Sequence, residues 1–124
     1  MNNKRLGNQW EKEFCNLLAS KGYWVHFIAS NRAGQQPFDV IAVKDNIPFA
    51  FDCKTAVKPI FPLSRLEENQ KFAFEKWIDC GNENCFLAIK YDGRMYLLKY
   101  ADLKGKGKID LREVDYVATT EGFD

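Results

Sequence analysis

Residues 37–54 read PFDVIAVKDNIPFAFDCK. Two runs rich in aromatic and β-branched residues, Phe38–Val43 and Phe49–Lys54, flank the turn-forming pair Asp45-Asn46. Short runs of this composition predict β-strands, and two turn residues between them predict an antiparallel hairpin. The hairpin decides which polar residues of the two strands face one another.

Two carboxylates and a lysine gather on one face of this hairpin. With the turn centred between its two residues, Lys44 faces Ile47 and Asp39 faces Asp52. This register assumes a two-residue turn; a three-residue turn would put the two aspartates out of line. Side chains alternate along a strand, so Lys54 shares the face of Asp52. Carboxylates placed opposite each other repel, and an unpaired charge is costly in an apolar strand.

This polar group has two interpretations. In the first, Asp39 and Asp52 are charges at the edge of the sheet, and Asp52 pairs with Lys54. In the second, a cation lies between the carboxylates. Oxygen donors with no histidine or thiol beside them suit a hard ion such as Mg²⁺ or Mn²⁺. Such an ion polarises a phosphodiester and lowers the pKa of a bound water, and Lys54 would orient that water or stabilise developing charge.

The segment Leu6–Ser20 has apolar residues at helical spacing, and Gly22 follows it as a stop signal. A third acidic residue of the site would come from this helix. Glu11 and Glu13 lie on opposite flanks of its apolar stripe, each about a quarter-turn from the centre. Periodicity does not choose between them, and either one can be an ordinary solvated glutamate.

The remaining strands are expected on both sides of these elements. Tyr23–Ala29 is aromatic and β-branched and predicts a strand, and Ser30–Gln36 reads as a loop. Cys85–Tyr91 and Met95–Tyr100 predict a second hairpin, around Asp92-Gly93. The tail from residue 101 has only short apolar patches and is left unassigned. This order predicts an α/β or α+β fold, with a central mixed sheet of about five strands flanked by helices.

A second helix is expected after the irregular segment Ala56–Pro62. Ser64 is predicted as its N-cap, with Glu67 completing a capping box, and the helix would run to about Asp79. Gln70 falls on the side that faces the sheet. A buried amide needs hydrogen-bond partners. Gln70 is therefore either a glutamine at the rim of the core or a group that holds the site or a water.

Composition is ordinary for one globular domain covering residues 1–124: 46% of the residues are hydrophobic and 28% are charged. No apolar run approaches the length of a membrane span, and the N-terminus lacks the apolar stretch of a signal peptide, so we expect a cytoplasmic protein. The net charge is only +1. Binding to nucleic acid therefore requires a local basic patch. The candidates are Lys4 with Arg5, and Lys104, Lys106 and Lys108.

The cysteines do not predict a zinc site. No pair has C-x-x-C spacing, and the single histidine, His26, lies in a strand-like run. Reduced, mostly buried thiols are expected. We also expect the three tryptophans to lie in the core rather than to stack on bases. These residues are Cys15, Cys53, Cys80 and Cys85, and Trp10, Trp24 and Trp77.

The hairpin residues resemble a known nuclease signature. Pro37-Phe38-Asp39, then twelve residues, then Asp52-Cys53-Lys54, matches the PD-(D/E)XK pattern. Two features outside the hairpin agree with it. The run Gly7-x-x-x-Glu11-x-x-Phe14 resembles the N-terminal motif of archaeal Holliday junction resolvases, and this resemblance selects Glu11 over Glu13. Ser30 matches a serine that those enzymes carry in a mobile loop.

Downstream residues are similar to the RecU-type resolvases of Gram-positive bacteria and their phages. The similar segments are Phe61-Pro62-Leu63-Ser64 leading to Gln70, then residues 85–89 and residues 96–98. Two departures stand out. RecU-type enzymes usually carry a long stalk between the strands of the motif, where this chain has only a two-residue turn. Asp52 stands where the resolvases mostly have glutamate, which shortens the reach to a metal by one methylene.

The resemblance implies a metal-dependent endonuclease that cuts four-way junctions as a homodimer in recombination or repair. Mg²⁺, with Mn²⁺ as a possible substitute, would be held by Asp39, Asp52 and the backbone carbonyl of Cys53, with Glu11 in the inner or outer shell. Lys54 would serve the attacking water, and Gln70 would support the site. Basic and polar residues would bind DNA. These are Ser30, Arg32, Lys4 and Arg5.

Two other functions fit the same residues. The first is a PD-(D/E)XK nuclease acting on flaps or duplex DNA, in restriction or repair. The second is a DNA-binding module with an inactive site. A degenerated nuclease is expected to lose at least one member of the catalytic set, and here the whole set is present. The members are Glu11, Asp39, Asp52 and Lys54.

Overall fold

The computed structural model describes residues 3–28 and 36–119, and for residues 3–6 and 118–119 it describes the backbone alone. The helical elements are α1 (Asn3–Ser20), η1 (Leu63–Arg65), α2 (Glu68–Asp79), α3 (Tyr100–Leu103) and η2 (Leu111–Glu113), where η denotes a 3₁₀ turn. The strands are β1 (Trp24–Phe27), β2 (Val40–Lys44), β3 (Ile47–Ala56), β4 (Ile60–Pro62), β5 (Cys85–Tyr91), β6 (Arg94–Lys99), β7 (Lys108–Asp110) and β8 (Ala118–Thr119). None of the described helices has the length and apolar character needed to cross a membrane.

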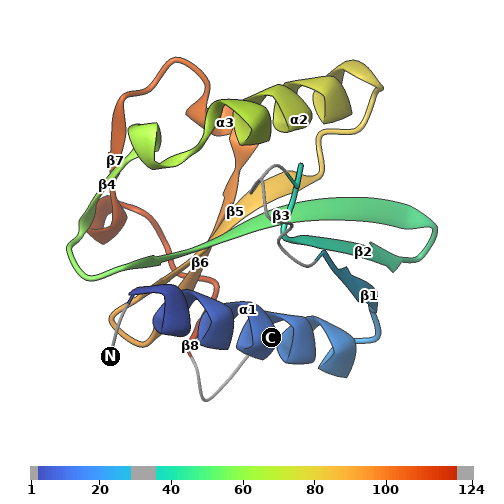
Figure 1. Ribbon diagram of the computed structural model, residues 1–124, viewed down its shortest axis with the longest axis horizontal. Helices are drawn as coiled ribbons and strands as arrows, with labels where there is room; N and C mark the ends of the chain where they lie inside the picture. Colours follow the sequence, from blue (N-terminus) through green and yellow to red (C-terminus); the bar gives the residue numbers. More distant parts are fainter. Residues whose placement is uncertain (1–2, 29–35, 120–124) are drawn as a thin grey trace.

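The main sheet has the strand order β1-β2-β3-β5-β6-β8 (Figure 1). Its neighbours are antiparallel except for β3 and β5, which run parallel and are joined by the crossover that contains α2. The mixed sheet that the sequence predicts is confirmed, with the two-residue β8 as an additional strand at one edge. Strands β4 and β7 form a separate antiparallel pair.

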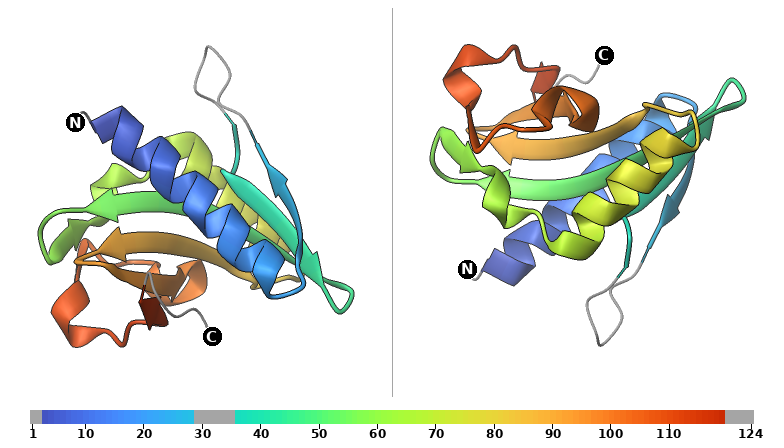
Figure 2. Two further views of the ribbon diagram at one scale, coloured as in Figure 1. Left: turned by 90° about the horizontal axis from the view of Figure 1, so that it is seen from below. Right: turned by 90° about the horizontal axis from the view of Figure 1, so that it is seen from above.

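The two long helices cover opposite faces of the sheet (Figures 1 and 2). Helix α1 packs Trp10, Phe14 and Leu18 against one face. Helix α2 packs Phe74 against the other, where Ala73 and Trp77 are partly buried. Each apolar cluster takes alternate residues of the central strands, as the period of two along a strand requires.

The β2–β3 hairpin has the register that the sequence predicts, with Lys44 opposite Ile47. Asp45 and Asn46 have φ values of 54° and 67°. Two successive left-handed residues are typical of the two-residue turn whose twist matches that of the flanking strands. The ladder ends at the pair Val40–Phe51. Asp39 therefore lies just before β2, beside β3 but outside the regular pairing.

Several local expectations are wrong. The segment expected to be irregular contains β4, which pairs with residues of the unassigned tail. The N-cap of α2 is Glu67, not Ser64, and the capping box joins Glu67 to Gln70. Ser64 belongs to the 3₁₀ turn η1, which ends where Leu66 adopts an extended backbone. The end of α2 at Asp79 is confirmed, and Gly81 follows with a φ of 99°.

Burial also differs from expectation in two places. Trp10 is buried and Trp77 is half-buried, but Trp24 has 61% of its surface exposed. Trp24 lies on the edge strand β1 and stacks on His26, with ring centroids 6.0 Å apart. The four cysteines are free, as expected, although Cys80 is exposed.

Candidate active site

Asp52 lies in the middle of β3 with its side chain fully buried. The Nε2 amide of Gln70 donates a hydrogen bond of 2.7 Å to Oδ1 of Asp52. Nζ of Lys54 lies 3.1 Å from Oδ2. That contact is an ion pair, and beyond it Oδ2 has no hydrogen-bond partner within the described residues. Burying a carboxylate is costly even when it has one ammonium partner, so this oxygen can take a further cation.

Asp39 is held by three hydrogen bonds to the backbone, two of them to β3 and one to Ile28 after β1. The amide of Asp39 donates to the carbonyl of Phe51 at 3.0 Å, and the amide of Ile28 donates to the carbonyl of Asp39 at 2.8 Å. The amide of Cys53 donates to Oδ2 of Asp39 at 2.8 Å. The carboxylate of Asp39 thus accepts the hydrogen bond that the backbone carbonyl of a paired strand would otherwise accept from Cys53.

This contact also orients the carbonyl of Cys53. The N–H and C=O groups of one residue in a strand point toward the same neighbour. The carbonyl of Cys53 is therefore on the side of Asp39, beyond the last pair of the β2–β3 ladder. A carboxylate and a backbone carbonyl lie together at this position, next to Asp52.

The two aspartates influence each other through their proximity. Burial raises the pKa of Asp52 well above its usual value, and the neighbouring carboxyl group of Asp39 raises it further. Lys54 acts in the opposite direction. The net shift is upward because desolvation of a fully buried carboxylate outweighs a single ammonium neighbour.

Glu11 faces this group from α1. Its pKa is raised to about 7, first by partial burial and then by the negative charge of Asp39, while Lys54 opposes the shift. Glu13 is engaged elsewhere, in a 2.9 Å ion pair with Lys90 of β5. Of the two glutamates that periodicity left open, the structure directs Glu11 toward Asp39 and pairs Glu13 with a lysine on the sheet.

Gln70 is buried at the first turn of α2 and has three polar contacts. Its Oε1 accepts a hydrogen bond from the amide of Glu67 at 3.0 Å, which is half of the capping box. The same oxygen accepts from Nζ of Lys54 at 3.4 Å, and its amide nitrogen binds Asp52. One side chain therefore joins the start of α2 to both charged residues of β3.

Two contacts that the sequence did not indicate hold α1 against the sheet. The indole N–H of Trp10 donates a buried hydrogen bond of 3.0 Å to the carbonyl of Ala88. Lys90, besides pairing with Glu13, lies over the ring of Trp10, 5.7 Å from its centroid. These residues are more than 70 positions apart in the chain, so no local pattern could have joined them. Together they fix the helix that presents Glu11.

Four of the expected DNA-binding residues cannot be placed at this site. Ser30 and Arg32 lie outside the described residues. Lys4 and Arg5 belong to the first turns of α1, but their side chains also lie outside the described part. Among the expected catalytic residues, the structure brings Asp39, Asp52, Lys54 and Gln70 together and directs Glu11 toward Asp39 and Lys54.

The donor set fits a hard divalent cation. It consists of two adjacent carboxylates and a backbone carbonyl, and one carboxylate oxygen lacks a hydrogen-bond partner within the described residues. Oxygen donors of this kind suit Mg²⁺ or Mn²⁺. Over residues 3–28 and 36–119, no three acidic, histidine or cysteine side chains converge on one point. The third protein ligand would therefore be the carbonyl of Cys53, with Glu11 farther away.

Comparisons with known proteins agree on one family. The sequence profile of the archaeal Holliday junction resolvase (Hjc) family matches residues 2–121. The crossover junction endodeoxyribonuclease Hjc of Methanocaldococcus jannaschii is 30% identical over 104 residues, which cover 84% of this chain and 73% of that protein.

A solved structure has the same fold. Hjc from Archaeoglobus fulgidus, a Holliday junction resolvase from an archaeal hyperthermophile, matches with a TM-score of 0.63 over 82% of this chain and 85% of that one. Its sequence identity is 18%, so this likeness establishes the fold alone. The family assignment rests on the profile and on the relative from Methanocaldococcus jannaschii: the chain belongs to the archaeal Holliday junction resolvase (Hjc) family of PD-(D/E)XK nucleases.

Proposed function

We propose that this protein is an endonuclease that resolves four-way DNA junctions and requires Mg²⁺, which Mn²⁺ can replace. The observation that carries the proposal is the fully buried Asp52, which touches Asp39, Lys54 and Gln70 in a chain of the Hjc family. Two adjacent carboxylates carry more negative charge than the single ammonium of Lys54 offsets, so this pair destabilises the fold unless a further cation binds. We infer that the site is retained for chemistry.

Each side chain then has a part in phosphodiester hydrolysis. Asp39, Asp52 and the carbonyl of Cys53 would hold the ion, which when bound supplies Lewis acidity and a more acidic water. Lys54, 3.1 Å from Asp52, is placed to orient the attacking water and to stabilise negative charge on the phosphate. Gln70 would keep Asp52 and Lys54 in position. Glu11 would bind the ion in its inner or outer coordination shell.

The test compares a labelled four-way junction with matched linear duplex and flap DNA, each with Mg²⁺, with Mn²⁺ and with EDTA. Symmetric nicks in the junction alone, only with metal, are expected. Metal-dependent cutting of flaps or duplex would keep the chemistry and assign the protein to restriction or repair. Junction binding without any cleavage would indicate a DNA-binding module with an inactive site.

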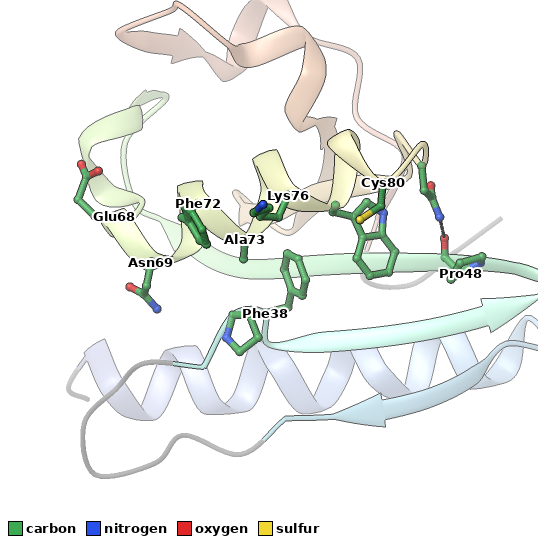
Figure 3. A pocket seen from close by; sticks show the side chains of 11 residues that line it. Phe38, Pro48, Glu68, Asn69, Phe72, Ala73, Lys76 and Cys80 are labelled. Carbon is green, nitrogen blue, oxygen red and sulfur yellow. Dashed lines mark hydrogen bonds between the residues drawn. The ribbon is translucent and has the colours of Figure 1, made fainter.

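We also propose that the enzyme works as a homodimer, as paired nicks require. A groove of about 890 Å³ opens between α2 and the β2–β3 hairpin (Figure 3). Its lining includes Phe38, Pro48 and Trp77. The side chain of Phe72 lines the same groove from α2 and is 63% exposed. A two-fold interface needs a surface patch complementary to itself. Here the exposed ring of Phe72 lies beside an apolar groove that can receive the same ring from a second copy.

Charges on α2 support a second copy as the occupant. Glu68 lies four residues before Phe72 and Lys76 four residues after it, and all three line the groove (Figure 3). If two α2 helices pack antiparallel about a two-fold axis at Phe72, Glu68 of each copy faces Lys76 of the other. The same axis would bring each Phe72 to the groove of the other copy.

Charge exchange tests this arrangement by light scattering over a range of protein concentrations. We expect Glu68→Lys and Lys76→Glu each to weaken the dimer, and the double variant to restore it, because both charges are then exchanged together. Positions 68 and 76 are two helical turns apart and do not pair within one helix, and the 3.7 Å pair of Glu68 with Lys71 is broken in both the single Glu68→Lys variant and the double variant, so it cannot account for the restoration. A wild-type protein that stays monomeric, or a double variant weaker than both singles, would contradict the dimer surface.

A further inference from the structure

Arg65 lies at the end of η1, next to the strand residues that form the candidate active site. Its Nη1 donates a hydrogen bond of 2.7 Å to the carbonyl of Thr55, the residue that follows Lys54 in β3. Its guanidinium lies over the ring of Phe61, 4.9 Å from the centroid. Phe61 is fully buried, so the ring is a fixed support. The exposed guanidinium is therefore held in one orientation.

An arginine held in this way suits a phosphate. The planar guanidinium has five N–H donors that match phosphate oxygens, and less entropy is lost on binding when its position is already set. Among the described residues, Arg65 makes no ion pair. Arg112, by contrast, is neutralised by Asp110 at 2.7 Å. The charge of Arg65 is thus available to an outside partner.

Further cations lie along the same small sheet. Strand β7 pairs with β4, which places Lys108 opposite Pro62, and the amide of Leu63 donates to the carbonyl of Gly107 at 3.0 Å. These contacts bring Lys106 and Lys108 alongside η1, and both side chains are exposed. Neither one forms an ion pair within the described part of the chain.

The connection from β3 adds to the positive charge. Residues 55–66 contain Lys58 and Arg65 but no acidic residue. The loop that carries Lys58 joins the end of β3 to β4, and β4 and β7 lie beyond that end of the sheet (Figure 1). The chain as a whole has a net charge of +1, so this is a local concentration of basic residues rather than a general property of the surface.

We propose that β4, η1 and β7 form a phosphate-binding surface for the DNA strand that enters the active site, with Arg65 as its fixed contact. Lys58, Lys106 and Lys108 would bind neighbouring phosphates. The inference rests on the proposed function, because it assigns a path for the substrate of that site. Backbone phosphates position a duplex without reading its sequence, which suits an enzyme selective for DNA shape.

The test measures binding of the full-length protein to a fluorescent four-way junction by anisotropy, in EDTA to prevent cleavage, at several salt concentrations. For each phosphate that a variant no longer neutralises, the slope of log K against log salt becomes less negative by about 0.9. We expect about that change for Arg65→Gln, and up to about twice that change for Lys106→Gln/Lys108→Gln. Arg65→Lys should restore part of the affinity of Arg65→Gln.

Lys104 provides the matched control. It belongs to the same Gly- and Lys-rich segment but lies 3.9 Å from Glu75 of α2. Lys104→Gln should therefore leave the salt slope unchanged. The double lysine variant breaks no ion pair within the described residues, so it reports on binding even if Arg65→Gln disturbs the turn. Circular dichroism would verify the fold of each variant.

Two failures are distinguishable. If the wild type binds and nicks the junction but Arg65→Gln and the double lysine variant keep its affinity and salt slope, the surface is wrong and the proposed function stands. If the wild type binds no DNA and cuts none with metal, the proposed function and this surface fail together.

Discussion

On the α1 side of β3, Phe49, Phe51 and Cys53 pack into an apolar cluster; on the α2 side, Ala50 and Asp52 are buried and Lys54 is partly so. Adjacent residues of one strand therefore meet opposite environments. Phe51 contacts Phe14 edge to face, with ring centroids 4.9 Å apart, and stabilises the fold. Asp52 is a desolvated carboxylate beside another carboxylate, and its ion pair with Lys54 offsets only part of that charge, so it destabilises the fold unless a metal cation is bound.

The comparison shows where stability and function are separated in this molecule. The side chains on the α1 face of β3 stabilise the fold. The charged side chains on its α2 face form the site and cost folding free energy. Substitutions at neighbouring positions should therefore change different measurable quantities.

Asp52→Asn should have the largest effect. It should slow cleavage while leaving folding and junction binding intact. The variant removes a metal ligand, and the loss of several kcal/mol of transition-state stabilisation corresponds to about a thousandfold slower cleavage. Asparagine can still accept the hydrogen bond from Gln70, so folding and junction binding should be retained. Single-turnover cleavage and anisotropy would measure the two properties. Cleavage at the wild-type rate would show that the site is assigned to the wrong residues.

Phe51→Ala should show the opposite pattern. Removing a buried phenylalanine destabilises a core by about 3–5 kcal/mol. We expect the free energy of unfolding in urea to fall by that amount, while the protein that remains folded keeps its dependence on metal. A loss of cleavage with no loss of stability would contradict the separation of the two faces of β3.

The sequence predicted the separation of these faces because it depends on local rules. A two-residue turn sets the register, and side chains alternate between the two faces of a strand. Asp52 and Lys54 could therefore be assigned to one face. The choice of Glu11 over Glu13 was different. It needed the resemblance to a family, because only the packing of α1 shows that Glu13 meets Lys90, 77 positions away.

Other features followed from contacts that local patterns do not contain. Ser64 has a residue type and spacing typical of an N-cap, but η1 intervenes and Glu67 caps α2. Gln70 was predicted to face the sheet, yet its part in the capping box was not recognised. Strands β4 and β7 have three residues each and depend on pairing across the chain. Trp24 is exposed because β1 is an edge strand.

Metal binding should stabilise the wild type and leave Asp52→Asn nearly unchanged. A ligand that binds only the folded state adds about 2.7 kcal/mol at a hundred times its Kd. We expect Mg²⁺ or Mn²⁺ to raise the Tm of the wild type, which scanning calorimetry would measure without any DNA. In the absence of metal, Asp52→Asn should be at least as stable as the wild type. An equal rise in Tm for both proteins would place the ion elsewhere.

The smallest expected effect is a pH dependence of stability that separates Glu11 from Glu13. The pKa of Glu11 is about 7 in the folded protein, against an ordinary value of 4.5. Between these values the folded state binds more protons than the unfolded state, so stability is present below pH 4.5 and is lost as the pH rises toward 7. The raised pKa of Asp52 acts in the same direction.

Metal-free thermal unfolding from pH 4.5 to 7.5 would measure this slope. Glu11→Gln should reduce it, because the amide does not titrate. Glu13→Gln is the matched control, two residues away on the same helix. It breaks a partly exposed ion pair that contributes at most about 1 kcal/mol, and it should lower stability slightly while keeping the slope. If Glu13→Gln reduced the slope and Glu11→Gln did not, then Glu13 would be the glutamate that senses the aspartates, and α1 would present its other flank to the site.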